Sequence, residues 1–150
     1  MTVLFLTAFS AIKANSITNR ITDDIFTAIR SIDYVSINVL LSDGIDIDTV
    51  DGDGNTPLMV AAEVGNPRIV DIILSHNPDV NKQNKKGETA LMIAAETGQL
   101  EICKKLVSHR ARVAIRNDDG NTAGSLASKF GHTKIVSFLR QVRSHTTFST

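Results

Sequence analysis

The chain has 150 residues, 42% of them hydrophobic, and its 16 basic and 16 acidic side chains give a formal net charge of zero. This length suffices for one domain with a sizeable core. The single cysteine, Cys103, excludes an intramolecular disulfide, and we expect it to be a small core residue. The charge is unevenly distributed, because residues 21–84 carry a net charge of −8 and residues 85–150 a net charge of +6. Charged residues on solvated faces would explain this uneven distribution, but a charge asymmetry between two halves of a chain is also informative about the partners that it binds.

The first residues form an apolar segment without charge from Met1 to Ile12. It is too short to span a bilayer. It resembles the apolar region of a secretory signal peptide, with Ala14-Asn15-Ser16 as a cleavage site, although the positively charged start is missing. We treat residues 1–19 as a separate segment with three interpretations: an export signal, a capping helix over the following domain, or a loose or partner-binding segment. The first would place the protein in the periplasm or outside the cell, and the others leave it cytoplasmic.

A triplet and a later glycine then recur at an interval of 33 residues. The triplets are Gly54-Asn55-Thr56, Gly87-Glu88-Thr89 and Gly120-Asn121-Thr122, and the later glycines are Gly65, Gly98 and Gly131. A fixed period between about 20 and 50 residues is typical of repeats stacked into a solenoid.

Each period predicts two short helices. In the best-formed unit Thr56 is placed to cap the first helix, with Pro57 at its first position and Gly65 at its end. Asn66-Pro67 starts the second helix in the same way, and Pro78 follows its end. Helices this short are unstable alone, so each pair must bury its apolar face against the next pair.

These motifs resemble the ankyrin repeat, notably Thr-Pro-Leu-Met-Val-Ala-Ala at 56–62, Thr-Ala-Leu-Met-Ile-Ala-Ala at 89–95 and Pro-Asp-Val-Asn at 78–81. The resemblance is to small ankyrin proteins such as those of bacteria. It implies an all-α solenoid of stacked helix-turn-helix units with β-hairpin-like turns. It covers four repeats, with approximate bounds 20–50, 51–83, 84–116 and 117–143. We expect residues 144–150 to form a flexible tail.

The first and last repeats depart from the pattern. In the first, Asp23 stands where Thr56 does and Ile32 stands where Gly65 does. In the last, Gly124-Ser125 replaces the Leu-Met pair. A helical glycine costs about 1 kcal/mol relative to alanine. We therefore expect the last repeat to be the least stable.

Nothing in the sequence indicates catalysis, and we expect no enzyme activity, no cofactor and no metal. Neither a phosphate-binding loop nor a nucleophile elbow is present. His76 and His109 share one repeat position and could be neighbours, but two histidines are too few for a zinc site. Aligning Asp51 on a calcium-binding loop puts Thr56 where glycine is required. We interpret Asp51 and the neighbouring acids Asp46 and Asp79 as turn residues. The basic residues of the second half lack interleaved aromatics, which argues against nucleic acid.

The resemblance implies that a partner protein binds the hairpin tips and the exposed face of each first helix. By position, these candidates are Asp53, Asn55, Glu63 and Val64, then Lys85, Lys86, Glu88, Glu96 and Thr97, then Asp118, Asp119, Asn121, Lys129 and Phe130. The tips alternate acidic, basic and acidic. Two alternatives stay open for Phe130, an exposed contact residue or a ring folded back into the space left by Gly124. Lys85 and Lys86 are either partner contacts or solvated turn residues.

The function that follows is a non-enzymatic protein–protein interaction module, monomeric and without a membrane span. One alternative is an inhibitor or regulator that covers a partner enzyme. Another is a structural protein that associates head to tail, with the acidic front of one copy against the basic rear of the next.

Overall fold

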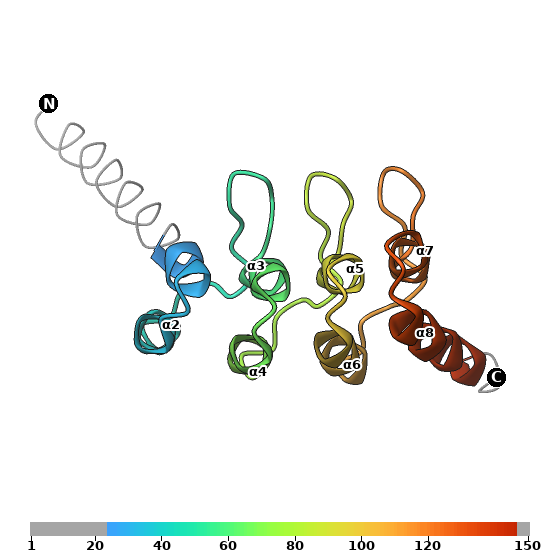
Figure 1. Cartoon of the computed structure of the whole chain (residues 1–150). Helices are drawn as coiled ribbons and strands as arrows, with labels where there is room; N and C mark the ends of the chain where they lie inside the picture. The colour runs from blue at the N-terminus through green and yellow to red at the C-terminus, as the bar shows by residue number, and fades with distance from the viewer. Residues whose placement is uncertain (1–23, 147–150) are drawn as a thin grey trace, which may run out of the picture.

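The computed structural model describes residues 24–146, so the predicted N-terminal segment 1–19 and the last four residues of the predicted tail lie outside the described residues. Helices lie in two parallel rows, and the first helix of each pair lies above the second (Figure 1). The loops at residues 43–56, 75–89 and 109–122 each precede a first helix and project from the upper row (Figure 1). We call them the first, second and third finger. No strand occurs between residues 24 and 146, so the fold is all-α as predicted.

Four helix pairs follow one another along the described chain. The first pair consists of a helix at residues 24–30 and α2 (Tyr34–Ser42). The others are α3 (Pro57–Val64) with α4 (Pro67–Leu74), α5 (Ala90–Glu96) with α6 (Leu100–Ser108), and α7 (Ala123–Lys129) with α8 (Thr133–Thr146). In the upper row α3 packs on α5 and α5 on α7, and in the lower row α4 packs on α6.

The predicted caps and stops are confirmed in the second pair. The Thr56 hydroxyl accepts a hydrogen bond from the Met59 amide at 3.3 Å. The Asn66 side chain accepts hydrogen bonds from the first amides of α4, at 3.1 Å from that of Arg68. Gly65 adopts the left-handed conformation at a φ of 74° that ends α3, which is the conformation for which glycine is favoured. The sequence therefore determines where these helices begin and end.

Small residues bring the first helices close together. The alanine pairs at 61–62 and 94–95 are fully buried, and so are the branched side chains of α4 and α6 that lie beneath them. Cys103 occupies this core with no exposed surface, and burial raises the pKa of its thiol to about 12. The prediction of a small core residue is confirmed.

Three histidines, His76, His109 and His132, make hydrogen bonds within the scaffold. His132 Nε2 donates a hydrogen bond to the Glu96 carbonyl of the preceding repeat at 2.8 Å. The rings of His76 and His109 each bond to a carbonyl oxygen one turn earlier in their own helix, at 2.9 Å in both cases. His132 thus joins two repeats, whereas His76 and His109 bond within their own repeats at the ends of the second helices.

Two features differ from the regular pattern. Ile32, at the position of Gly65, keeps a positive φ of 57° although its side chain is β-branched. The last helix continues to Thr146, past the approximate repeat boundary predicted at 143, so residues 144–146 are helical. The second helices of the middle repeats stop before Asn77 and Arg110, which have positive φ values. Their counterpart Arg143 lies within α8.

Candidate protein-binding groove

The fingers are closed by hydrogen bonds between their two sides. The Asp51 amide donates to the Asn55 carbonyl at 3.0 Å, and the Asn84 amide donates to the Glu88 carbonyl at 3.0 Å. The Asp51 carboxylate also accepts hydrogen bonds from the amides of Asp53 and Asn55. Partial burial opposes ionisation of Asp51, but these bonds and one from Arg30 outweigh it and lower the pKa of this carboxyl. Asp51 is therefore a charged turn residue, as predicted.

Neighbouring fingers are also joined to each other. The Lys85 amide donates to the Asp53 carbonyl at 3.1 Å, and the Asn84 amide nitrogen Nδ2 donates to Asn55 Oδ1 at 2.9 Å. The Lys85 ammonium donates to the Gly52 carbonyl at 2.7 Å. Lys85 is exposed and at the same time bonds to the neighbouring finger. These bonds hold the two fingers as one preformed surface.

A groove of about 440 Å³ lies between these fingers and the first helices α3 and α5. Eight of the predicted partner-binding residues line it, namely Asp53, Asn55, Glu63, Lys85, Lys86, Glu88, Glu96 and Thr97. The structure therefore brings together, on one concave surface, residues that come from two different repeats and are up to 44 positions apart in sequence.

Acidic groups dominate the groove. Within residues 24–146, the carboxylates of Asp53, Glu63 and Glu96 have neither an ion-pair nor a hydrogen-bond partner. The Glu88 carboxylate accepts only one neutral hydrogen bond, from Asn84 Nδ2 at 3.0 Å. Four carboxylates line the groove against two lysines, Lys85 and Lys86, and the Lys85 ammonium is held by the Gly52 carbonyl. The groove therefore carries an excess of negative charge.

The remaining predicted residues lie outside this groove. Val64 is half-buried and packs against the core, and Asn121 closes the third finger through its amide bond to Asn117 Oδ1 at 2.8 Å. Asp118 and Asp119 are exposed on that finger, and the Asp118 amide donates to the Lys86 carbonyl at 3.0 Å. The third finger therefore continues the concave surface without contributing to the groove.

Phe130 and Lys129 form an exposed pair at the end of α7. The Phe130 side chain is 47% exposed, and the Lys129 ammonium lies 5.7 Å from the centre of its ring. Phe130 does not line the space beside Gly124, so the ring is not folded back into it. A ring that faces solvent beside a cation is available to a partner.

Two groove residues were not predicted from the sequence, Asn84 and Ile93. Asn84 stands one period after Asp51, which the sequence predicts to be a turn residue. Ile93 occupies the same repeat position as Val60 and Leu126, which are both buried. It differs from them only in being partly exposed, on the concave side. The sequence carries no signal for that exposure.

The described chain offers no metal site or membrane helix. Between residues 24 and 146 no three His, Cys, Asp or Glu side chains converge as metal ligands do. None of the helices in this part of the chain combines the length and apolarity needed to cross a bilayer.

Helix pairs that stack at a constant interval, with projecting fingers and a concave face, define a helical-repeat solenoid. A family model described as ankyrin repeats (3 copies) matches residues 25–117 and again residues 76–147. The chain therefore belongs to the ankyrin-repeat family. Ankyrin repeats are in general protein–protein interaction modules, typically without enzymatic activity. No curated protein matches the sequence.

Proposed function

We propose that this chain binds a partner protein in the groove between its first two fingers, and that the partner contributes a segment rich in arginine or lysine. The observation that carries this proposal is the set of three carboxylates, Asp53, Glu63 and Glu96, that share one groove without a partner in the described structure. Carboxylates that line one groove attract a cationic ligand, which donates charge-assisted hydrogen bonds to them.

Rigidity of the groove supports tight binding. The main-chain bond from Lys85 to Asp53 and the side-chain bond from Asn84 to Asn55 fix the two fingers before any partner arrives. Binding to a preformed surface avoids the free-energy cost of ordering loops. The charge then contributes mainly to the choice of partner and to the association rate.

Charge changes along the concave surface, which gives the bound segment a direction. Glu63 and Glu96 occupy one position in successive first helices, and Lys129 occupies the same position in the next. Beside Lys129 the exposed ring of Phe130 offers an apolar contact. We therefore expect the cationic part of the segment over α3 and α5, and an acidic or apolar part over α7.

The test is a selection of random peptides displayed on phage, with the full chain as bait. The comparison bait carries Asp53→Asn, Glu63→Gln and Glu96→Gln, which keep side-chain shape and remove charge. A matched control bait carries Asp79→Asn, Asp71→Asn and Glu101→Gln, three exposed acids away from the groove. We expect peptides enriched in arginine and lysine that bind the wild type and the control at least tenfold more tightly than the groove variant.

Enriched peptides without cationic residues, or equal binding to all three baits, would contradict the proposal. A cationic consensus that is lost with the control bait alone would place the binding surface on the second helices.

A further inference from the structure

Each internal repeat forms a socket that the next repeat fills. A methyl group built on Gly65 would meet Gln99 of the next repeat at 2.6 Å, and one on Gly98 would meet His132 at 2.6 Å. In the fingers, Gly87 faces Asp118 in the same way, at 2.7 Å. The last repeat has the same glycine, but a methyl group on Gly131 would meet no atom within 4 Å. The socket of the last repeat is therefore open in the described structure.

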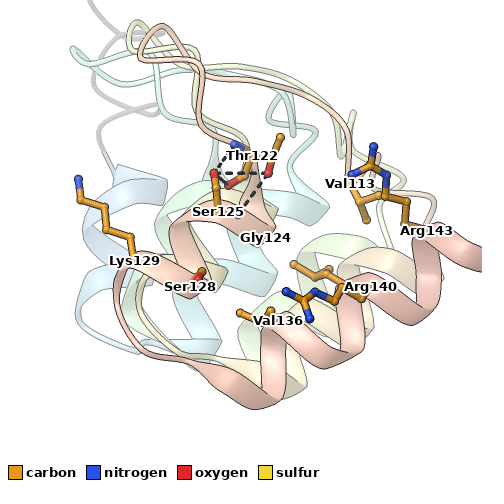
Figure 2. A pocket seen from close by; sticks show the side chains of 10 residues that line it. Val113, Thr122, Gly124, Ser125, Ser128, Lys129, Val136, Arg140 and Arg143 are labelled. Atoms are coloured by element: carbon orange, nitrogen blue, oxygen red, sulfur yellow. Dashed lines mark hydrogen bonds between the residues drawn. The ribbon is translucent and has the colours of Figure 1, made fainter.

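A groove of about 500 Å³ lies on this open end face, between α7 and α8. Ser128 points into it from α7, and Val136 and Arg140 from α8 (Figure 2). Its apolar floor is reduced, because Gly124, Ser125 and Ser128 stand where the preceding repeat buries Leu91, Met92 and Ala95. Its charged lining residues are all basic, namely Lys129, Arg140 and Arg143.

The opposite end of the described solenoid carries the complementary features. A second groove, of about 370 Å³, lies between the helix at residues 24–30 and α2, and its charged lining residues are Asp24 and Asp33. Val35 and Val39 also line it, and they are 73% and 52% exposed. They rank among the few large hydrophobic side chains exposed in the described residues. One end face is therefore basic, and the other is acidic with an apolar stripe.

The repeat register predicts which residues meet if a second copy continues the stack. Inside the chain, His132 reaches back to the Glu96 carbonyl and to Gly98. The counterpart of His132 in the first repeat is Asp33, and the counterparts of Glu96 and Gly98 in the last repeat are Lys129 and Gly131. The acceptor inside the chain is a main-chain carbonyl, so the same packing places Asp33 of one copy beside the main chain of Lys129 in another, and the two charges meet through the flexible lysine side chain.

We propose that a second copy of this chain docks head to tail, its acidic first-repeat face on the basic last-repeat face, in the register that places Asp33 beside Lys129. The contact is heterologous, so it leaves a free end on each copy and continues into open chains. Because the complementarity resides in exposed charges, the association weakens as salt screens them. This face shares Lys129 with the concave surface over α7, but it contains none of the three groove carboxylates Asp53, Glu63 and Glu96, so the two proposals are tested separately.

The test is the mass of the full chain in solution by sedimentation equilibrium, at low salt and at high salt, about 0.01 M and about 1 M, where the screening lengths are about 30 Å and 3 Å. The tail variant carries Lys129→Glu and Arg140→Glu. The front variant carries Asp24→Lys and Asp33→Asn, and the asparagine keeps the acceptor that caps α2. A matched control carries Lys104→Glu and Arg112→Glu, which remove two exposed cations elsewhere.

We expect the wild type and the control to exceed the monomer mass of 16.2 kDa at low salt, and to return to it at high salt. Each variant alone should stay monomeric, because its two ends carry the same sign of charge. An equimolar mixture of the two should associate again, because each end then meets an opposite charge. That recovery also shows that both variants are folded.

Three results would overturn the proposal. One is a wild type that stays monomeric at low salt and high concentration. Another is self-association that the tail variant retains or that the control loses. The third is a mixture of the two variants that stays monomeric.

Discussion

Substituting alanine for Gly98 measures how strongly one repeat holds the next. A methyl group at this position would lie 2.6 Å from His132 Cε1, so the ring must move away from the Glu96 carbonyl that it contacts at 2.8 Å. Gly131→Ala is the matched control, because it has the same φ of 78° but meets no atom within 4 Å.

The two substitutions share the backbone cost and differ in the contact. The left-handed conformation costs an L-residue about 1–2 kcal/mol, and the loss of chain entropy in the unfolded state returns about 0.4–1 kcal/mol. Gly131→Ala should therefore lower the free energy of unfolding by about 1 kcal/mol or less. Gly98→Ala additionally forfeits a hydrogen bond, about 1 kcal/mol, and disturbs the packing of a ring, about 1 kcal/mol more. We expect a difference of about 2 kcal/mol between the two variants.

Urea unfolding followed by circular dichroism gives both free energies. The same substitutions are repeated on a His132→Ala background, where the ring is absent and the extra cost of Gly98→Ala should vanish. Equal losses for the two variants on the wild-type background, within about 0.5 kcal/mol, would refute the inferred contact between repeats.

Three further predictions concern stability. Ile32→Gly should raise the free energy of unfolding by up to about 1 kcal/mol, because a β-branched residue holds a φ of 57° there. A lower free energy of unfolding for this variant in urea would mean that the side-chain contacts of Ile32 outweigh the strain. The Cys103 thiol has its pKa raised by burial from 9.0 to about 12, so above pH 9 it ionises in the unfolded state alone and stability must fall as pH rises. The loss between about pH 8 and pH 10 should be about 1 kcal/mol greater for the wild type than for Cys103→Val, and identical pH profiles would refute this account. In native-state hydrogen exchange, amides of α7 and α8 should exchange faster than those of α3 to α6, and Gly124→Ala should slow them; slowest exchange in α7 would contradict an unstable last repeat.

Local chemistry explains why so much of the fold was predictable. A threonine cap followed by proline begins α3, and a glycine with positive φ ends it. One period later Thr89 caps α5 without the proline, and Gly98 has the same positive φ. The buried alanines and Cys103 followed from the repeat alone, since equivalent positions occupy equivalent environments.

The ends of the solenoid were harder to predict, because the periodicity supplies no neighbour there. The continuation of α8 to Thr146 departs from the preceding period, in which α6 ends at Ser108, and no local motif announces it. Ile32 keeps the backbone conformation of a glycine because the surrounding repeat imposes it on an unsuitable residue.

The candidate groove was predictable in its members but not in its bonding. Position in the repeat identified eight of its lining residues. Whether a side chain there has a partner depends on the distances between fingers. The Lys85 ammonium bonds to the Gly52 carbonyl, whereas the Asp53 carboxylate has no partner in the described residues. Such distinctions arise from packing between repeats and have no signature within a single one.

The most direct test of the central proposal is to map a bound ligand on the full chain by NMR. The probe is a cationic peptide from the selection, titrated into the ¹⁵N-labelled protein with the glutamine and asparagine groove variant as comparison. We predict amide shifts confined to the two fingers and to α3 and α5, centred on Asp53, Glu63 and Glu96, and at least a tenfold loss of affinity in the variant. Shifts centred on α4 and α6 or on the end faces, with affinity unchanged in the variant, would contradict the proposed binding groove.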